Sequence, residues 1–199
     1  MVVFLHGVLT NGSLWDPIVD RLRDRYRCVV PELPFGAHRT PMPDDADLDL
    51  ASLAKMIAGF LVELDLRDVT LVCNDWGGAQ LVIAPGGSDR VGGLVLVSCE
   101  AFDNYPPGIP GRLLCFNASL PGGTFLTAQL LRSRLIRYLP FTCGALTKKR
   151  MPNEQFMSLI EPLRHKPKVD DSRTLIPIDQ PEILTGHLER FLARTTGIR

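Results

Sequence analysis

One stretch of the chain, residues 69–80, restricts the possible folds more than any other. Its β-branched and apolar residues end abruptly at Asn74 and Asp75, and two glycines and helix-compatible residues follow. This order is typical of a strand, a tight turn and a helix. Asp75 lies between the small residues Cys73 and Gly77, which is the spacing of a nucleophile elbow. We therefore predict that the Asp75 side chain projects over the end of a sheet.

An aspartate at such a turn has two interpretations. A carboxylate is ionised at neutral pH and is a nucleophile without help from a base. A helix beginning at Trp76 would direct free N–H groups and a partial positive charge toward it. Alternatively, Asp75 only caps that helix, as aspartates often do. The spacing leaves both interpretations open, and the surrounding sequence has to decide between them.

The rest of the first half alternates strands with helices. Apolar runs at 1–5, 27–31 and 93–99 predict strands in addition to the one before Asp75. Amphipathic patterns predict one helix capped by Ser13 and running to Leu22, and a second from Leu50 to Leu64. Continuous apolar strands that alternate with helices indicate an α/β fold, with a mostly parallel sheet flanked by helices.

The second half of the sequence lacks the alternation of strands and helices. A linker rich in proline and glycine covers 104–111, and helical patches without convincing strands continue to about residue 165. A last amphipathic helix follows Pro181. We predict a core made of residues 1–104 and 168–199, with residues 105–167 as a helical cap over the sheet.

Composition restricts the partners. The chain has 22 basic and 22 acidic side chains and a formal net charge of zero, so no overall charge favours nucleic acid or an anionic membrane. Basic clusters at 148–150 and 164–166 predict solvated ends or loops. We expect a small-molecule substrate, and neither nucleic acid nor membrane as a partner.

The five cysteines are an odd number without a paired short spacing, which predicts neither a disulfide framework nor a zinc site. We expect no metal and no cofactor. Reduced, strand-end cysteines fit the cytoplasm, and the sequence shows no apolar run of membrane-spanning length and no signal-peptide pattern.

The order of these motifs resembles the α/β-hydrolase superfamily. A strand ending at His6 and Gly7, a helix, the elbow at Asp75, another strand and a helical insertion follow one another over nearly the whole chain. An aspartate in the nucleophile position is similar to the haloalkane dehalogenase and epoxide hydrolase branch. The segments 34–42 and 74–79 are also similar to bacterial proteins described only as α/β-fold hydrolases.

The resemblance implies a reaction in two steps. Asp75 attacks an electrophilic carbon and forms an ester, while the backbone N–H groups of Val8 and Trp76 hold the other carboxylate oxygen. Water activated by a histidine then hydrolyses the ester. The resemblance also implies that the Trp76 indole donates to a leaving halide. Packing under the cap is an equally open role for this side chain, because a buried indole needs an acceptor in either case.

The chain departs from the family's pattern in three places. Two leading strands should precede Met1, and a late strand with its acid-bearing loop has no counterpart before residue 171. We therefore expect the Met1 strand to lie near an open sheet edge, through which copies of the chain can associate. Counting back from 179–181 puts the family's histidine position at Thr174, and threonine is not a general base near neutral pH.

The four histidines are candidates to replace that base. We expect His6 to order the loop after its strand, and His165 and His187 to be surface residues. His38 lies in a long loop that can reach the site, although a loop hydrogen bond is the simpler interpretation.

Glu100 and Asp103 follow the strand next to the elbow, where some family members carry the orienting acid, and solvated loop carboxylates are the alternative. We take Asp75, Trp76, Val8 and Glu100 as the candidate catalytic residues.

Three functions remain to be weighed. The first is a hydrolase that uses Asp75 on a small apolar halide, epoxide or ester, with turnover hindered by Thr174. The second is a non-catalytic protein of the same fold that binds a small molecule. The third, a nucleotide-binding domain, is disfavoured because residues 74–78 lack the glycine spacing and the lysine that hold phosphates.

Overall fold

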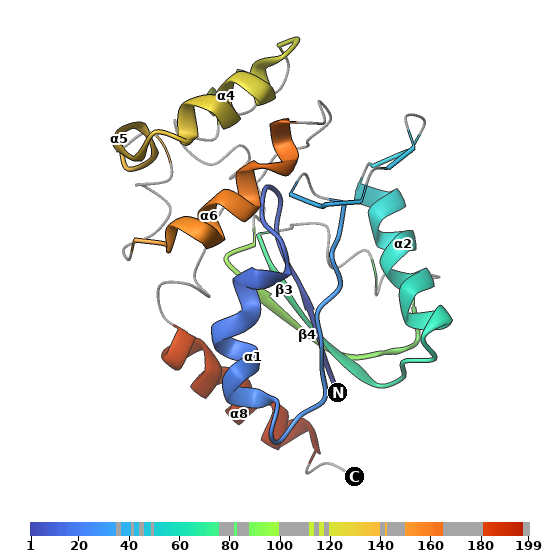
Figure 1. The fold of residues 1–199 in the computed structure, drawn as a ribbon. Coiled ribbons are helices and arrows are strands. Elements are labelled where there is room, and N and C mark those ends of the chain that lie inside the picture. Colours follow the sequence, from blue (N-terminus) through green and yellow to red (C-terminus); the bar gives the residue numbers. More distant parts are fainter. Residues whose placement is uncertain are drawn as a thin grey trace.

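Four parallel strands form the sheet at the centre of the computed structural model (Figure 1). They are β1 (Val2–Leu5), β2 (Cys28–Val29), β3 (Val69–Asn74) and β4 (Val91–Val97), in the spatial order β2-β1-β3-β4. The parallel sheet expected from the sequence is therefore confirmed. The structure describes residues 1–34, 37–40, 42–43, 46–48, 50–75, 82, 88–99, 112–113, 116–117, 120–139, 142, 150–164 and 181–196.

Helices cover both faces of this sheet. Successive residues of a strand point to opposite faces, so Val2 and Phe4 join one core and Val3 and Leu5 join the other. The first core contains residues of α1 (Asp16–Leu22) and α8 (Pro181–Thr196). The second contains the buried side of α2 (Leu50–Glu63). Burial on both faces explains why the central strands β1 and β3 are almost entirely apolar rather than alternating.

The first helical segment differs from its expected start. A 3-10 turn, η1 (Gly12–Trp15), precedes α1, and Asn11 caps it instead of Ser13. The Asn11 Oδ1 accepts hydrogen bonds from both the backbone N–H and the hydroxyl of Ser13, at 3.1 and 2.7 Å. Ser13 is therefore a donor to the cap, and Pro17 sits in the first turn of α1, where its missing N–H costs nothing.

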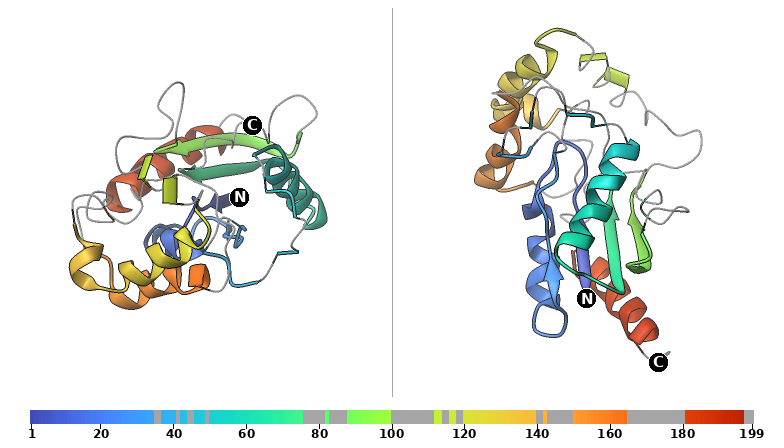
Figure 2. Two further views of the ribbon diagram at one scale, coloured as in Figure 1. Left: turned by 90° about the horizontal axis from the view of Figure 1, so that it is seen from above. Right: turned by 90° about the vertical axis from the view of Figure 1, so that its right-hand side faces the viewer.

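A group of short helices lies at the end of the molecule opposite the termini (Figures 1 and 2). They are α4 (Gly123–Leu131), α5 (Arg134–Arg137), α6 (Asn153–Ile160) and η4 (Pro162–Arg164). Within this group, α6 supplies Phe156 and Leu159 to the same core as α1 and α8. The cap boundaries at 105 and 167 fall outside the described residues and stay a prediction.

Buried Arg137 joins α5 to α6. Its guanidinium donates to the carbonyl oxygens of Leu131 and Arg132 and to the Asn153 Oδ1, and it stacks 3.9 Å from the centre of the Phe156 ring. The charge is thus balanced by carbonyl dipoles, an amide and an aromatic face. These contacts fix α5 to α6.

The Met1 strand is not itself an edge of the sheet. β1 lies between β2 and β3, and the edge strand beside it, β2, has only two residues. Short edge strands offer little backbone to a second chain. Among the described residues, no helix is both long and apolar enough to cross a membrane.

Helix α2 offers a test of the second core. Ile57 is 1% exposed, whereas its neighbour Met56 is 37% exposed. We expect Ile57→Ala to lower the free energy of unfolding by about 2–5 kcal/mol, because it leaves a cavity against the sheet. Met56→Ala should change it by less than about 1 kcal/mol. Urea denaturation of both variants measures the difference, and equal effects would contradict this packing.

Candidate active site

Asp75 follows β3 directly and is almost fully buried, at 1% exposed. Its φ of 68° is in the left-handed region, which is unusual for a residue other than glycine. Its backbone N–H donates to the carbonyl oxygen of Val97 at 3.2 Å, and the Asn74 side-chain amide donates to the same oxygen at 3.0 Å. The end of β3 is therefore clamped to the end of β4, and the backbone bends at Asp75. The helix expected after this bend lies outside the described residues, so the nucleophile elbow stays a prediction.

The loop after β1 meets Asp75. Parallel pairing places Leu5 beside Cys73, so the residues that follow β1 and β3 emerge at the same edge of the sheet. The Val8 N–H donates to the Asp75 Oδ2 at 3.2 Å. The predicted neighbourhood of Val8 and Asp75 is thus present, and one carboxylate oxygen is held by a backbone donor.

Gly7 makes this approach possible. A Cβ at this position would lie 2.5 Å from the Asp75 Cβ and 2.6 Å from its Oδ2. Any other residue would have to displace the carboxylate, because such distances are far inside van der Waals contact. The glycine is required for closeness of approach, which the His6-Gly7 pattern alone did not reveal.

His6 holds this loop in place and is not available as a base. The His6 Nδ1 lies 3.0 Å from the Gly7 carbonyl oxygen, and the Leu33 N–H donates to the His6 Nε2 at 2.8 Å. These partners assign the proton to Nδ1 and leave the ring neutral. Burial lowers the pKa of His6 from 6.5 to about 4. The expectation that His6 orders the loop is confirmed.

The loop has further support from Thr10. Its hydroxyl and its backbone N–H both donate to the Gly7 carbonyl oxygen, at 2.7 and 3.3 Å. The Gly7 carbonyl therefore faces His6 and Thr10, which leaves the Val8 N–H directed at Asp75. This is the arrangement of a preorganised backbone donor.

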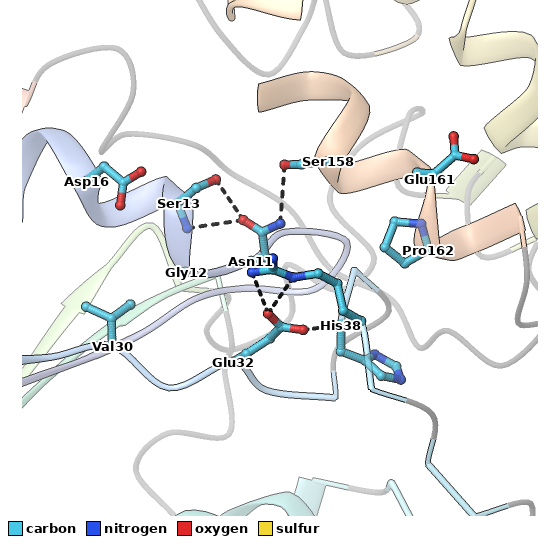
Figure 3. Close-up of a pocket in the computed structure, with 11 residues that line it drawn as sticks. Asn11, Gly12, Ser13, Asp16, Val30, Glu32, His38, Ser158, Glu161 and Pro162 are labelled. Atoms are coloured by element: carbon cyan, nitrogen blue, oxygen red, sulfur yellow. Dashed lines mark hydrogen bonds and ion pairs between the residues drawn. The ribbon is translucent and has the colours of Figure 1, made fainter. Parts of the chain in front are cut away.

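A pocket of about 750 Å³ opens beside this loop (Figure 3). Asn11, Ser13 and Asp16 line it from η1 and the start of α1, and Ser158 and Glu161 line it from the α6 side. The Asn11 side-chain amide lies 3.4 Å from the Ser158 hydroxyl and connects these two walls. Neither Asp75 nor Val8 is among the described residues that line the pocket.

His38 lies on the wall of this pocket, together with Glu32 and Arg39. It is buried, and it lies near enough to His6 that a positive charge on it would lower the pKa of His6. Burial raises the pKa of Glu32, but hydrogen bonds from the Arg39 backbone and guanidinium outweigh that effect and leave the pKa below its ordinary value. The Glu32–Arg39 ion pair thus fixes the loop that carries His38. Both interpretations of His38, a base and a loop residue, stay open.

We expect the thiol of Cys73, near the end of β3, to be unreactive. Burial, with a smaller contribution from Cys99, raises the pKa of the Cys73 thiol well above its ordinary value. Cys73 is 0% exposed and belongs to the second core, so it acts as a small apolar side chain.

Several predicted site residues lie outside the described part of the chain. These are Trp76, Glu100, Asp103, Thr174 and His165, together with the side chain of His187. Their roles stay predictions. Among the residues that the structure describes, no group of three or more His, Cys, Asp or Glu side chains is placed to hold a metal ion.

Sequence reasoning missed Asn74 and Asn11. Asn74 is the polar residue beside Asp75, and its position directly after an apolar run was a signal that it ties the strand end. Asn11 lies two residues before Ser13, and both are good capping residues, so the sequence alone carried no signal that chose between them.

The comparison with protein families gives the class of protein. The family model described as the alpha/beta hydrolase family matches residues 2–193. A match over almost the whole chain, together with the parallel sheet, shows that the chain belongs to the alpha/beta hydrolase family.

Curated relatives resemble parts of the chain. A non-heme chloroperoxidase of Kitasatospora aureofaciens is 35% identical over 120 residues, which are 56% of this chain and 43% of the relative. A haloalkane dehalogenase of Mesorhizobium japonicum is 37% identical over 78 residues, 39% of this chain and 25% of the relative. These matches therefore span less than half the length of either relative.

Solved structures share the fold at low identity. The haloalkane dehalogenase DatA of Agrobacterium tumefaciens is 16% identical with a TM-score of 0.66, covering 98% of this chain and 89% of that one. A Pseudomonas aeruginosa protein provisionally named an epoxide hydrolase is 16% identical with a TM-score of 0.68, covering 98% and 89%. At this identity the likeness shows the fold alone.

The close approach at Gly7 yields a direct test. We expect Gly7→Ala to lower the free energy of unfolding by about 1–3 kcal/mol, because the new methyl group overlaps the Asp75 side chain. Gly59→Ala is the matched control, since a Cβ on this α2 glycine meets nothing within 4 Å. It should leave stability unchanged or raise it by up to about 1 kcal/mol. Thermal and urea unfolding measure both, and a Gly7→Ala protein as stable as the native chain would show that the approach is not close.

Buried neutral His6 predicts a pH dependence. As the pH falls through 6.5, the unfolded chain protonates this imidazole, whereas the folded chain keeps it neutral down to about pH 4. The unfolded state binds more protons across that window, so stability falls with falling pH, by on the order of 3 kcal/mol in total. Urea denaturation at a series of pH values measures this slope. His6→Gln, which keeps a neutral acceptor for the Leu33 N–H, should flatten it, and an unchanged slope in this variant would refute the assignment.

Proposed function

We propose that the chain is a hydrolase that uses Asp75 as the nucleophile on the electrophilic carbon of a small apolar halide or epoxide. The observation that carries this proposal is the hydrogen bond from the Val8 N–H to the Asp75 Oδ2, on a buried carboxylate held in the left-handed region directly after β3. The membership in the alpha/beta hydrolase family and the haloalkane dehalogenases among the relatives support it.

The first step needs few groups. The Val8 N–H holds Oδ2, so Oδ1 attacks the carbon. A C–O bond forms and the bond to the leaving group breaks, with the electron pair leaving on the halide or on the epoxide oxygen. The product is an ester of Asp75. In this proposal, the backbone N–H of Trp76 is the second donor to Oδ2 and its indole N–H binds the leaving halide.

The second step returns the carboxylate. Water attacks the carbonyl carbon of the ester, the Val8 and Trp76 N–H groups hold the oxyanion, and its collapse releases an alcohol. The attacking water must lose a proton to a base that Glu100 would orient. Thr174 occupies the position of that base, so we expect this step to be slower by about 10²–10⁴-fold than with a histidine.

Because the ester is expected to form faster than it is hydrolysed, we predict that it accumulates. Incubation with a small haloalkane should add one alkyl group to the chain, on the tryptic peptide 68–90, with little release of alcohol. That peptide carries Asp68, Asp75 and Asp89. Asp75→Asn should abolish the labelling, and Asp89→Asn, on an exposed turn, should leave it unchanged. Intact-protein and peptide mass spectrometry read out both.

Other outcomes separate the alternatives. Thr174→His should restore slow hydrolysis of the ester if the loop that carries it lies over Asp75. Repeated turnover by the native chain would contradict the proposed stall, and His38→Ala would then test whether His38 supplies the base. Failure of every halide and epoxide to label the chain would overturn the hydrolase proposal in favour of a non-catalytic binding protein, which the threonine at position 174 favours.

A further inference from the structure

The chain's charges are unevenly distributed. Between residues 104 and 153 the sequence holds seven lysines and arginines and no aspartate or glutamate, although the whole chain has 22 of each sign. Within this segment, Arg112, Arg132, Arg134 and Arg150 are described and exposed. A net charge of zero therefore conceals a strongly basic region.

The same segment exposes apolar side chains. Of the twelve exposed large apolar residues in the described part of the chain, eight lie between positions 113 and 139. On α4, Phe125, Leu126 and Leu130 are 49%, 57% and 46% exposed. Their spacing puts them on one side of the helix, while Ala128 on the opposite side is buried. The outward side of α4 therefore carries three exposed apolar side chains, with the half-buried Gln129 among them.

The neighbouring helix α5 also carries exposed apolar and basic side chains. Leu135 on α5 is 85% exposed, with Arg134 before it and Arg132 at the end of α4. Both helices lie at the end of the molecule opposite the termini, as Figure 1 and the right-hand view of Figure 2 show. We call the surface formed by Phe125, Leu126, Leu130, Arg132, Arg134 and Leu135 the basic apolar face.

We propose that the basic apolar face binds an anionic lipid surface. Exposed apolar side chains of a surface helix can enter the boundary between headgroups and acyl chains, and arginines beside them pair with lipid phosphates. Each basic residue near such a surface contributes to binding, and the contribution falls with salt. The combination of exposed leucine and phenylalanine with unbalanced arginine matches this partner in both respects.

Charge argues against a second copy as the occupant. A symmetric dimer through the basic apolar face would bring Arg132 and Arg134 against the same residues of the partner. The described carboxylates nearest along the chain are Glu154, on α6, and Glu161, directly after it. Glu161 is paired with Arg164. Arg137 holds α5 against α6 and so supports the basic apolar face.

Vesicle binding of the full chain tests the proposal. We expect the partition coefficient on vesicles of phosphatidylcholine with phosphatidylglycerol to exceed that on phosphatidylcholine alone by at least about tenfold, and to fall as salt is added. The double variant Arg132→Ser, Arg134→Ser should weaken binding to the anionic vesicles by about tenfold. The double variant Phe125→Ser, Leu126→Ser should do the same by removing apolar area. Vesicle flotation measures all of these.

A matched control lies on α2. Lys55 and Val62 are exposed there, so Lys55→Ser, Val62→Ser removes the same kinds of side chain from another surface. This control should bind like the native chain. Leu135→Ser, a single change at an 85% exposed site, gives a second test that leaves the packing untouched.

Three results would overturn the proposal. They are equal binding to neutral and anionic vesicles, equal loss in the α2 control, and no vesicle binding together with concentration-dependent self-association that Phe125→Ser, Leu126→Ser abolishes. The last would assign the basic apolar face to contacts between copies of the chain.

Discussion

The hydrogen bond from the Val8 N–H to the Asp75 Oδ2 is the interaction on which the site depends. It requires that β1 and β3 pair in parallel, so that both chain segments leave the sheet at the same edge. It also requires a glycine at position 7, since a Cβ there would lie 2.6 Å from the same oxygen. His6 completes the arrangement by holding the Gly7 carbonyl and the Leu33 N–H from within the core. A catalytic function for Asp75 thus rests on backbone geometry that the sheet provides.

Part of the fold and of the site could be predicted from the sequence. The central strands β1 and β3 could be predicted because both of their faces are buried, which makes them almost entirely apolar. A bend at Asp75 could be expected because the strand stops at a polar pair between small residues, whereas the helix that should follow lies outside the described residues and stays a prediction. The cap at Asn11 could not be predicted, because Asn11 and Ser13 are both good capping residues and only the hydrogen bonds at Asn11 Oδ1 decide between them. The approach at Gly7 was equally hidden, since it depends on where a residue 68 positions later comes to lie.

A balance of 22 basic and 22 acidic residues predicts no electrostatic partner for the chain as a whole. That balance does not describe the segment 104–153, which holds α4 and α5 and carries seven basic and no acidic side chains. The fold places these helices at one end, away from both termini. Charge that cancels in the sum does not cancel at a surface, because interactions between exposed charges are screened within about 10 Å.

We propose that Asp75 is a nucleophile with one oxygen held by the Val8 backbone. A crystal structure of the chain after reaction with a small haloalkane would show this directly. We expect continuous density from the Asp75 Oδ1 to the alkyl carbon, with Oδ2 still within hydrogen-bond distance of the Val8 N. An unmodified Asp75 beside an alkyl group on another side chain, or a carboxylate rotated away from Val8, would contradict it.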